Sequence, residues 1–506
     1  MDALLTREPG RRALLLGNEA IVRGALEAGV AVATAYPGTP SSEIADNFYR
    51  LSQRTDLYFE YSTNEKVALE VAAGAAIAGM RSLVSMKHVG LNVAADPLNT
   101  LAYTGVRAGM IIVTADDPAM HSSQNEQDNR FYAKLSLLPM LEPADPAEAL
   151  AMAREGFRLS EELGAPVLLR TTTRVNHTRG VCTLGELEER EFGGHFEKDP
   201  FRWVPVPLVA RRLRVLQLER VERLAARVDD LPFNRLENQA GTLGIVASGV
   251  AYSYVKEVLR QLGAADRIKV LKIGTIHPLP RRLIARFLET SERVLVVEEL
   301  EPYLETELKA IAHEIGARAR IHGKLGRDGN GFPPVPRIYE LSPDRIRPAV
   351  SALLGRPVPE PAARRPVDLP ERPPIFCAGC THRNSYYAIK SIAEPDTYFA
   401  SDIGCYTLGL LPPMSTVDSF LCMGSSVTQA QGSGIRNPQK IVAFIGDSTF
   451  FHSGLTGLAN AVHNGHDLML VILDNRTTAM TGHQPHVGTD CASEGATSLD
   501  IVRAVR

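Results

Sequence analysis

The strongest constraint on the fold comes from residues 441–482, which read IVAFIGDSTFFHSGLTGLANAVHNGHDLMLVILDNRTTAMTG. An apolar run ends at Gly446-Asp447-Ser448, and a helical pattern extends from about Leu455 to His463. A second apolar run, 468–473, ends in Asp474-Asn475. This order predicts a βαβ unit, because two parallel strands need a crossover connection that is usually a helix. Open α/β sheets bind their ligands at the carboxyl ends of such strands.

The polar residues at these two strand ends predict a metal site. Mg²⁺ bound to a diphosphate takes a few protein oxygens in octahedral geometry and shares its remaining positions with phosphate and water. The side chains of Asp447 and Asn475, with a carbonyl just after them, that of Thr477, form such a ligand set. A lone acid at a strand end would favour an ordinary βαβ unit, but the paired spacing and Gly454 at the helix start favour the metal site.

The same segment resembles the thiamine diphosphate motif, a Gly-Asp-Gly sequence followed at a set distance by Asn-Asn. Gly446 and Asp447 match the first two positions, and Ser448 stands where the motif has its last Gly. After 25 intervening residues (449–473), Asp474 replaces the first Asn and Asn475 matches the second. The segment therefore predicts the diphosphate end of a thiamine site.

Composition places the chain among cytoplasmic enzymes. It is 44% hydrophobic and 22% charged with a net charge of −3, which gives no electrostatic case for a nucleic acid or a membrane partner. The N-terminal sequence MDALLTREPGRR lacks the apolar core of a signal peptide. The six cysteines are then expected to be reduced thiols or metal ligands rather than a disulfide framework.

Changes in composition divide the 506 residues into about three domains. We expect an α/β domain at 1–185, a charged connector at 186–240, a Rossmann-like α/β domain at 241–355, a Pro/Arg-rich linker at 356–374 and a third α/β domain at 375–506. Apolar runs in the first domain predict strands at 13–16, 30–36, 82–85, 109–114 and 166–170. The third domain stops soon after the metal loop, so we expect it to be incomplete by a strand and a helix.

The first domain holds a second group of candidate residues. The sequence TAYPGTPSS, at 34–42, predicts a strand, a turn and a helix start, with Ser41 or Ser42 as the helix cap. The Ala- and Gly-rich helix that follows within 60–79 has Glu65 near its start. Thiamine chemistry needs one carboxylate against the pyrimidine ring nitrogen, which Glu65 would supply. Taken alone, Glu65 is better explained as an acid at a helix N-terminus, where the helix dipole favours negative charge.

Seven motifs are ordered along nearly the whole chain: YPGTPSSE, STNEKVALEVAAGAAIAG, SMKHVGLN, DDPAMHSSQNEQDNR, FCAGCTHR, SDIGCYTLG and GDSTFFHSG. They are similar to the alpha subunit of indolepyruvate ferredoxin oxidoreductase, within the thiamine-dependent 2-oxoacid:ferredoxin oxidoreductases. The resemblance implies a pyrimidine-binding domain first, a transketolase-C-type domain in the middle and a thiamine diphosphate/Mg²⁺ domain last. It implies that Glu65 is the ring-nitrogen glutamate and that Thr39 faces the substrate or the thiamine. Its cofactor-binding positions are Gly446, Asp447, Ser448, Asn475, Thr477, Gly404 and Cys405.

The implied reaction is oxidative decarboxylation of an aryl 2-oxoacid with coenzyme A to an acyl-CoA, carbon dioxide and reduced ferredoxin. The implied partners are the small beta subunit, ferredoxin, coenzyme A and the 2-oxoacid, in an oligomer. One alternative is non-oxidative decarboxylation to an aldehyde; another is a truncated, non-catalytic subunit, against which the intact Glu65, Asp447 and Asn475 argue. In pyruvate-type relatives an arginine after the strand VTA grips the substrate carboxylate. Asp116 stands at that position here, which fits a bulkier 2-oxoacid and leaves the carboxylate partner unassigned.

Two polar segments of the first domain are also candidates for the active site. His88, in SMKHVGLN, follows a predicted strand in a Gly-containing turn, which favours an active-site role over a structural one. The run 121–129, HSSQNEQDN, is dense in hydrogen-bonding groups after a strand end. We expect this loop to face the substrate or another subunit, although solvated surface is the simpler interpretation.

The cysteines of the third domain form a candidate metal centre. Cys377 and Cys380 lie in a CAGC sequence, and Cys405 lies in a predicted turn. Three thiolates favour an iron–sulfur cluster, [4Fe-4S], or zinc. The resemblance implies a fourth Cys beyond the metal loop, for which Cys491 is the candidate and Cys422 an outside choice; another chain or a non-Cys ligand is the alternative. The alternative, in which CAGC only shapes a cofactor-binding turn, has equal support from the sequence. Cys182 is expected to be a buried, unreactive thiol; it is not counted among these ligands.

Overall fold

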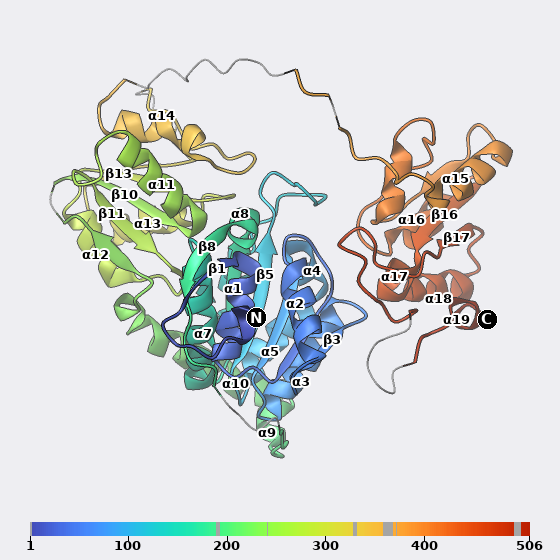
Figure 1. The fold of residues 1–506 in the computed structure, drawn as a ribbon, viewed down its shortest axis with the longest axis horizontal. Helices are drawn as coiled ribbons and strands as arrows, with labels where there is room; N and C mark the ends of the chain where they lie inside the picture. Colours follow the sequence, from blue (N-terminus) through green and yellow to red (C-terminus); the bar gives the residue numbers. More distant parts are fainter. Residues whose placement is uncertain are drawn as a thin grey trace. The chain divides into compact units, whose positions relative to one another are not determined.

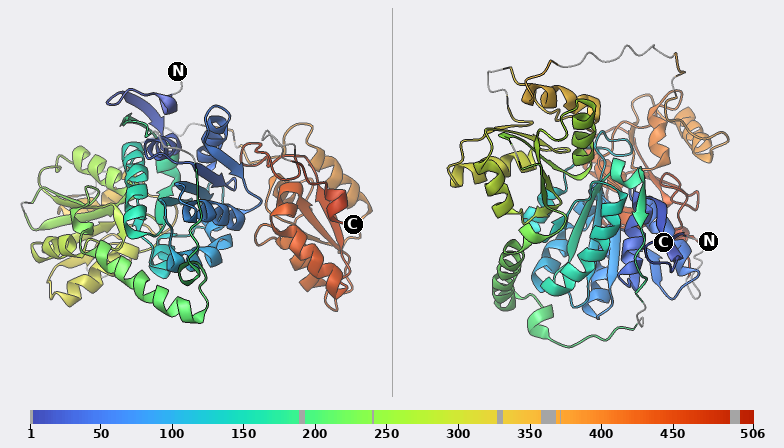
Figure 2. Two further views of the ribbon diagram at one scale, coloured as in Figure 1. Left: turned by 90° about the horizontal axis from the view of Figure 1, so that it is seen from below. Right: turned by 60° about the vertical axis from the view of Figure 1, so that its left-hand side comes forward.

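A computed structural model describes residues 3–188, 193–239, 241–326, 331–357, 368–370, 372–489 and 497–506. The chain forms two compact units (Figures 1 and 2). The first comprises residues 1–60 and 65–361, and the second comprises residues 61–64 and 362–506. Within the described ranges, no helix is both long and apolar enough to cross a bilayer.

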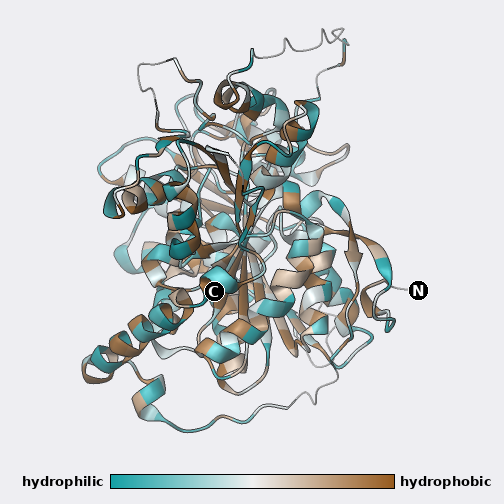
Figure 3. Cartoon of the chain, turned by 90° about the vertical axis from the view of Figure 1, so that its left-hand side faces the viewer, coloured by the Kyte–Doolittle hydropathy of each residue, from teal (hydrophilic) through white to brown (hydrophobic). Residues whose placement is uncertain are grey.

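The first unit is built around a seven-stranded, mostly parallel sheet with the order β12-β6-β7-β5-β4-β2-β3. Its strands are β2 (Val32–Ala35), β3 (Tyr58–Tyr61), β4 (Ser82–Lys87), β5 (Met110–Asp116), β6 (Met140–Leu141), β7 (Val167–Thr172) and β12 (Thr275–His277). The helices of this half are α1 (Gly17–Glu27), α2 (Ser42–Ser52), α3 (Glu65–Ile77), α4 (His88–Val93), α5 (Ala95–Thr104), α6 (Arg130–Ser136), α7 (Pro146–Leu163) and α8 (Thr173–His177). Every residue of β5 and β7 is buried, as expected for parallel strands covered on both faces. Figure 3 shows the apolar residues concentrated on such strands.

One predicted strand lies outside this sheet. The apolar run at 13–16 forms β1 (Arg12–Leu16), which pairs antiparallel with β8 (Arg179–Thr183) in a separate two-stranded sheet. Cys182 lies in β8 opposite Ala13 and is fully buried, and burial raises the pKa of its thiol to about 11. The prediction of a buried thiol at this position is confirmed.

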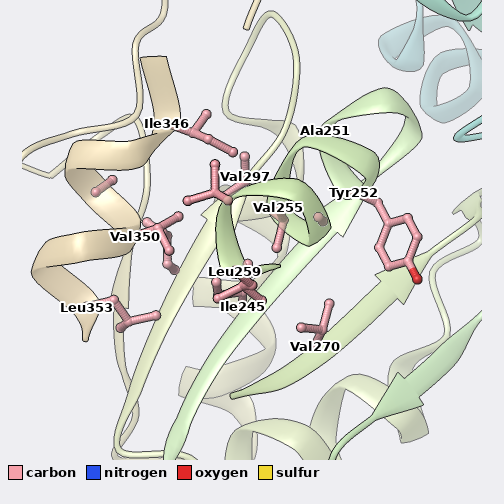
Figure 4. Packing of buried hydrophobic residues seen from close by; sticks show 14 of the residues in the cluster. Ile245, Ala251, Tyr252, Val255, Leu259, Val270, Val297, Ile346, Val350 and Leu353 are labelled. Carbon is pink, nitrogen blue, oxygen red and sulfur yellow. The ribbon is translucent and has the colours of Figure 1, made fainter. Parts of the chain in front are cut away.

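A second, five-stranded sheet has the order β14-β13-β10-β11-β9. Its strands are β9 (Arg235–Glu237), β10 (Leu243–Ser248), β11 (Lys269–Ile273), β13 (Arg293–Val297) and β14 (Arg320–His322). Around it lie α11 (Gly249–Gln261), α12 (Arg281–Glu289), α13 (Tyr303–Glu314) and α14 (Pro343–Leu353). The helices α9 (Pro200–Trp203) and α10 (Pro207–Ala225) precede this sheet in the chain, and α10 packs against α5 of the other half. Side chains of α11 and α14 pack on β10 and β13 to form its core (Figure 4).

The two sheets of the first unit are tied together. Strand β12 comes from the middle of the chain but pairs antiparallel with β6 of the seven-stranded sheet. Arg130 is fully buried between the two halves; it donates to Asp128 and to Glu298 Oε2 (2.6 Å), and to the Glu299 carbonyl. Removing one partner of such a buried ion pair typically costs about 3–5 kcal/mol. The predicted boundary near residue 240 therefore falls inside one compact unit.

The second unit holds a three-stranded parallel sheet with the order β15-β16-β17. Its strands are β15 (Tyr398–Ala400), β16 (Ile441–Gly446) and β17 (Met469–Leu473), and its helices are α15 (Thr381–Ile392), α16 (Ser425–Gly434), α17 (Asp447–Thr449), α18 (Leu455–Asn464) and α19 (Ile501–Ala504). The predicted βαβ unit is confirmed, with the crossover helix α18 between β16 and β17. Between α17 and α18 the helix widens into a π-helical turn, Phe450–Gly454, a feature often found at functional sites. The α/β, parallel-sheet fold class predicted from the sequence is confirmed.

Candidate active site

Asp447 lies directly after β16 and is 3% exposed. Its Oδ1 accepts the Ser448 N–H at 2.9 Å, and its Oδ2 lies 3.0 Å from His486 Nε2. The Gly488 N–H donates to His486 Nδ1 at 3.1 Å, so the ring hydrogen is on Nε2 and points at the carboxylate. Burial alone would raise the pKa of Asp447, but His486 and the Ser448 N–H lower it below its ordinary value. The carboxylate is therefore ionised and held in one orientation.

The end of the neighbouring strand brings a second acid close to Asp447. Strand β17 pairs with β16 so that Leu473 lies opposite Gly446, which places Asp474 beside Asp447. Burial and a hydrogen bond with Asp447 raise the pKa of Asp474. The proximity of the two carboxyl groups therefore favours a shared proton or a positive charge between them.

The loop after β17 shapes the same edge of the sheet. The Asn475 side-chain oxygen accepts the Thr477 N–H at 3.2 Å, and Thr478 Oγ1 donates to Ser448 Oγ at 2.9 Å. The structure thus brings Asp447, Ser448, Asn475 and Thr477 together at the carboxyl ends of two adjacent strands. The ligand roles assigned to these residues from the sequence stay predictions.

His382, which the sequence interpretation did not single out, lies near this edge. Its Nδ1 is 3.5 Å from Cys380 Sγ, and its buried Nε2 has no hydrogen-bond partner within the described residues. Burial lowers the pKa of His382, and the negative charge of Asp447 opposes that shift. An unpartnered ring nitrogen within the field of Asp447 fits a diphosphate with its Mg²⁺. The signal available in the sequence was the position of His382 within the FCAGCTHR motif.

Tyr406 explains why glycine is needed at two predicted cofactor-binding positions. A methyl group on Gly404 would lie 2.4 Å from Tyr406 Cε1, and one on Gly446 would lie 2.5 Å from the same atom. The Tyr406 hydroxyl donates to the Ile403 carbonyl at 2.9 Å. The ring therefore packs between the turn after β15 and the end of β16, and fixes their separation.

The three candidate cluster cysteines lie near one another. Burial, and then the charges of Cys380 and Cys377, raise the pKa of the Cys405 thiol. Across the described ranges, however, no three His, Cys, Asp or Glu side chains are arranged to hold a metal ion. Cys422 is exposed, and burial and Asp402 raise its pKa. Cys491 lies outside the described residues, so the cluster stays a prediction.

Glu65 is the first residue of α3 and is 5% exposed. Its side chain lies against Gly90 of α4, because a methyl group there would be 2.6 Å from Glu65 Oε1 and 2.7 Å from its Cγ. Only glycine leaves this space, so the KHVGLN motif makes room for the carboxylate. The sequence interpretation identified Glu65 but missed Gly90.

The predicted roles of Thr39 and His88 are not tested by the structure, which does show how each is placed. Thr39 lies in the turn between β2 and α2, where Ser41 Oγ donates to the Gly38 carbonyl at 2.8 Å and accepts no helix N–H as a cap would. His88 is fully buried with Nε2 3.1 Å from Asn125 Oδ1. Burial, and then the charge of Lys87, lower the pKa of His88, so the ring is neutral near pH 7.

Asp116 and the last two residues of the polar loop 121–129, Asp128 and Asn129, are buried, whereas His121, Ser122, Gln124 and Asn125 of that loop are exposed. Asp116 is fully buried, accepts from Arg170 Nε at 2.8 Å and accepts the Asn129 N–H at 3.1 Å. Asn129 Nδ2 also donates to the His88 carbonyl at 3.0 Å. At the position where pyruvate-type relatives have an arginine, this chain therefore has a structural ion pair.

Comparison with known proteins supports the same chemistry. The C-terminal TPP-binding domain of thiamine pyrophosphate enzymes matches residues 402–505, and the thiamine diphosphate-binding domain of pyruvate flavodoxin/ferredoxin oxidoreductases matches residues 23–210. The indolepyruvate oxidoreductase subunit IorA of Methanothermobacter thermautotrophicus is 49% identical over 516 residues, covering 100% of this chain and 82% of that protein. The subunit IorA of Thermococcus kodakarensis is 46% identical, covering 98% and 79%.

This chain belongs to the indolepyruvate oxidoreductase subunit IorA family. It is a thiamine diphosphate-dependent oxidoreductase that acts in 2-oxoacid oxidation. The family predicted from the sequence motifs is confirmed. The structure of a 2-oxoglutarate:ferredoxin oxidoreductase from Magnetococcus marinus is similar with a TM-score of 0.53 and 16% identity, covering 68% of this chain and 65% of that one. At that identity the likeness shows that this IorA-family chain shares the fold, and no more.

Proposed function

We propose that this chain is the thiamine-binding subunit of an enzyme that oxidatively decarboxylates aryl 2-oxoacids of the indolepyruvate type. The products are carbon dioxide and, with coenzyme A, an acyl-CoA; the two electrons released pass to ferredoxin. The observation that carries the proposal is the similarity along the whole chain to relatives named indolepyruvate oxidoreductase. We infer a small beta subunit as partner, because those relatives are named as subunits.

The second unit holds the residues that would bind the diphosphate. Asp447 and Asn475, with the Thr477 carbonyl, would hold Mg²⁺ and through it the diphosphate, and Asp474 would add negative charge beside the metal. His486 keeps Asp447 oriented through its Nε2–H. The unpartnered Nε2 of His382 would donate to the diphosphate. These contacts support the binding of an anionic cofactor at this sheet edge.

The first unit supplies the group that moves a proton. Bound thiamine diphosphate would provide the carbanion chemistry that cleaves the bond to the carboxylate. Glu65 would accept a hydrogen bond from the pyrimidine ring nitrogen, and its burial against Gly90 keeps water from competing for that contact. Thr39 and the neutral His88 would face the substrate. A cluster on Cys377, Cys380 and Cys405 would give the electrons a route out.

Turnover by the purified complex tests this proposal. The chain is co-expressed with its small subunit, purified without oxygen and assayed with thiamine diphosphate, Mg²⁺, coenzyme A and ferredoxin. Indolepyruvate and phenylpyruvate are compared with pyruvate and 2-oxoglutarate. We expect two electrons to be transferred to ferredoxin for each acyl-CoA that is formed. The aryl substrates should be preferred.

Two other products would reject parts of the proposal. An aldehyde formed without ferredoxin reduction would identify a non-oxidative decarboxylase. Preference for pyruvate or 2-oxoglutarate would reject the aryl specificity. Iron and acid-labile sulfide analysis of the same sample tests the cluster, since zinc or no metal at the cysteines would exclude it.

A further inference from the structure

Lys87 is a half-buried cation at the carboxyl end of the seven-stranded sheet. It is the last residue of β4, which lies between β2 and β5. Its stem packs on the turn after β2, because a methyl group on Gly38 would lie 2.9 Å from Lys87 Cγ. The next residue of that turn is Thr39. Lys87 and Thr39 therefore belong to the same small region of the sheet end.

The ammonium group of Lys87 is only partly satisfied. Within the described residues its one hydrogen bond is to the Ser122 carbonyl, at 2.7 Å, and it forms no ion pair. The other cations nearby are already neutralised. Arg170 pairs with Asp116 at 2.8 Å, and His177 lies 3.5 Å from Glu43. Lys87 thus has donor capacity to spare, since an ammonium has three hydrogens.

The acids around Lys87 are engaged elsewhere. Asp117 accepts hydrogen bonds from the Ser122 N–H (2.8 Å), Ser123 Oγ (2.7 Å) and Thr173 Oγ1 (2.8 Å). Glu65 lies against Gly90. Both acids act on Lys87 through their charge, but burial has the larger effect and lowers the pKa of Lys87 to about 8. At neutral pH the side chain is therefore mostly protonated and poorly solvated.

We propose that Lys87 binds the carboxylate of the 2-oxoacid substrate, an inference that rests on the proposed function. A 2-oxoacid carries one carboxylate, which must be held until it leaves as carbon dioxide. Asp116 cannot hold it, because it is an acid buried in an ion pair. Lys87 packs on the turn that holds Thr39, and the charge of Glu65 acts on it. A half-buried ammonium binds an anion more strongly than one in water. The structure also allows a packing role alone, in which the lysine stem only supports the Gly38 turn.

A comparison of a charged with an uncharged ligand separates these two roles. The complex with its small subunit is assayed with phenylpyruvate and a dye acceptor, and 2-oxo-3-phenylpropanamide is used as an uncharged competitive inhibitor. We expect Lys87→Met to raise the KM for phenylpyruvate about 10–100-fold, the usual effect of losing a charged hydrogen bond. The inhibition constant of the amide should change less than about twofold, because the amide has no carboxylate to lose its partner.

Two further variants complete the test. Lys87→Arg keeps the charge, so it should recover most of the affinity for phenylpyruvate. Lys256→Met is the control: Lys256 lies far from Lys87 along the chain and pairs with Glu237 at 2.5 Å. This change should alter neither the KM for phenylpyruvate nor the inhibition constant of the amide. If Lys87→Met does not fold, Lys87→Gln is measured instead, with thiamine diphosphate affinity as the folding control.

The outcomes are decisive in each direction. Equal weakening of the acid and the amide would show a packing role and overturn the proposal, and so would an unchanged KM for phenylpyruvate. A wild-type complex that turns over no aryl 2-oxoacid would instead reject the proposed function. The failure of one proposal is therefore distinguishable from the failure of the other.

Discussion

The two units hold their central carboxylates by different means. Glu65 of the first unit is fixed by packing: it is 5% exposed and lies in the space that Gly90 leaves. Asp447 of the second unit is fixed by hydrogen bonds, from the Ser448 N–H at 2.9 Å and from His486 Nε2 at 3.0 Å. Both acids are buried, at 5% and 3% exposed, so both lie in a dry environment. The hydrogen bonds to Asp447 also fix the direction of its oxygens, which suits the metal-ligand role proposed for it.

The largest expected effect is on the activation of thiamine diphosphate and not on its binding. Glu65→Gln should keep the fold and much of the thiamine diphosphate affinity but lose about 10²–10⁴-fold in turnover, the usual contribution of acid–base assistance. The amide still hydrogen-bonds the ring but cannot support its charge shift. Deuterium exchange at the thiazolium carbon reports this step, and an exchange rate equal to wild type would remove Glu65 from the mechanism.

The orientation of Asp447 depends on its hydrogen bond with His486. His486→Ala should weaken Mg²⁺-dependent thiamine diphosphate binding about 10–100-fold, because outer partners of metal ligands typically contribute that much. His486→Gln, which can still donate to Asp447, should recover part of the loss. His483→Asn changes an exposed histidine of the same loop and serves as the control. Binding unchanged in His486→Ala would show that Asp447 needs no such support.

The packing of Glu65 depends on the space that Gly90 leaves. Gly90→Ala should lower turnover by about tenfold or more, because the new methyl group would displace the Glu65 carboxylate. The matched control is Gly74→Ala in α3, where nothing lies within 4 Å of the added carbon. That change should raise stability by about 0.5–1 kcal/mol and leave turnover alone. Equal turnover of the two variants would contradict the packing account.

The smallest effect is a pH dependence set by Lys87. Burial lowers the pKa of Lys87 to about 8, against the opposing charges of Asp117 and Glu65, while the neighbouring His88 is neutral. The protonated form binds the carboxylate, so kcat/KM for phenylpyruvate should be constant below about pH 8 and fall above it. In Lys87→Arg this decline should disappear, since arginine stays charged. A wild-type profile that is flat to pH 10, well past that value, would count against Lys87.

The sequence predicted the strands and the two central acids better than it predicted the residues that contact them. The spacing between Ser448 and Asp474 indicated the βαβ unit because strand, helix and strand follow one another directly along the chain. The sequence could not reveal that His486 returns to Asp447, since a loop of irregular structure has no periodicity to read. For the same reason the pairing of β1 with β8 was missed: an apolar run indicates a strand but not its partner. The burial of Lys87 and the space left by Gly90 likewise depend on tertiary packing.

Calorimetric titration of thiamine diphosphate tests the central claim most directly. The wild-type complex and Asp447→Ala are compared with and without Mg²⁺, and Asp467→Ala is the control, since Asp467 is exposed just before the start of β17. We expect the wild type and the control to bind only with Mg²⁺, and Asp447→Ala to bind at least about 100-fold more weakly, as expected when a direct metal ligand is lost. Thiamine diphosphate binding by Asp447→Ala at wild-type affinity, with Mg²⁺ present, would contradict the assignment of the site.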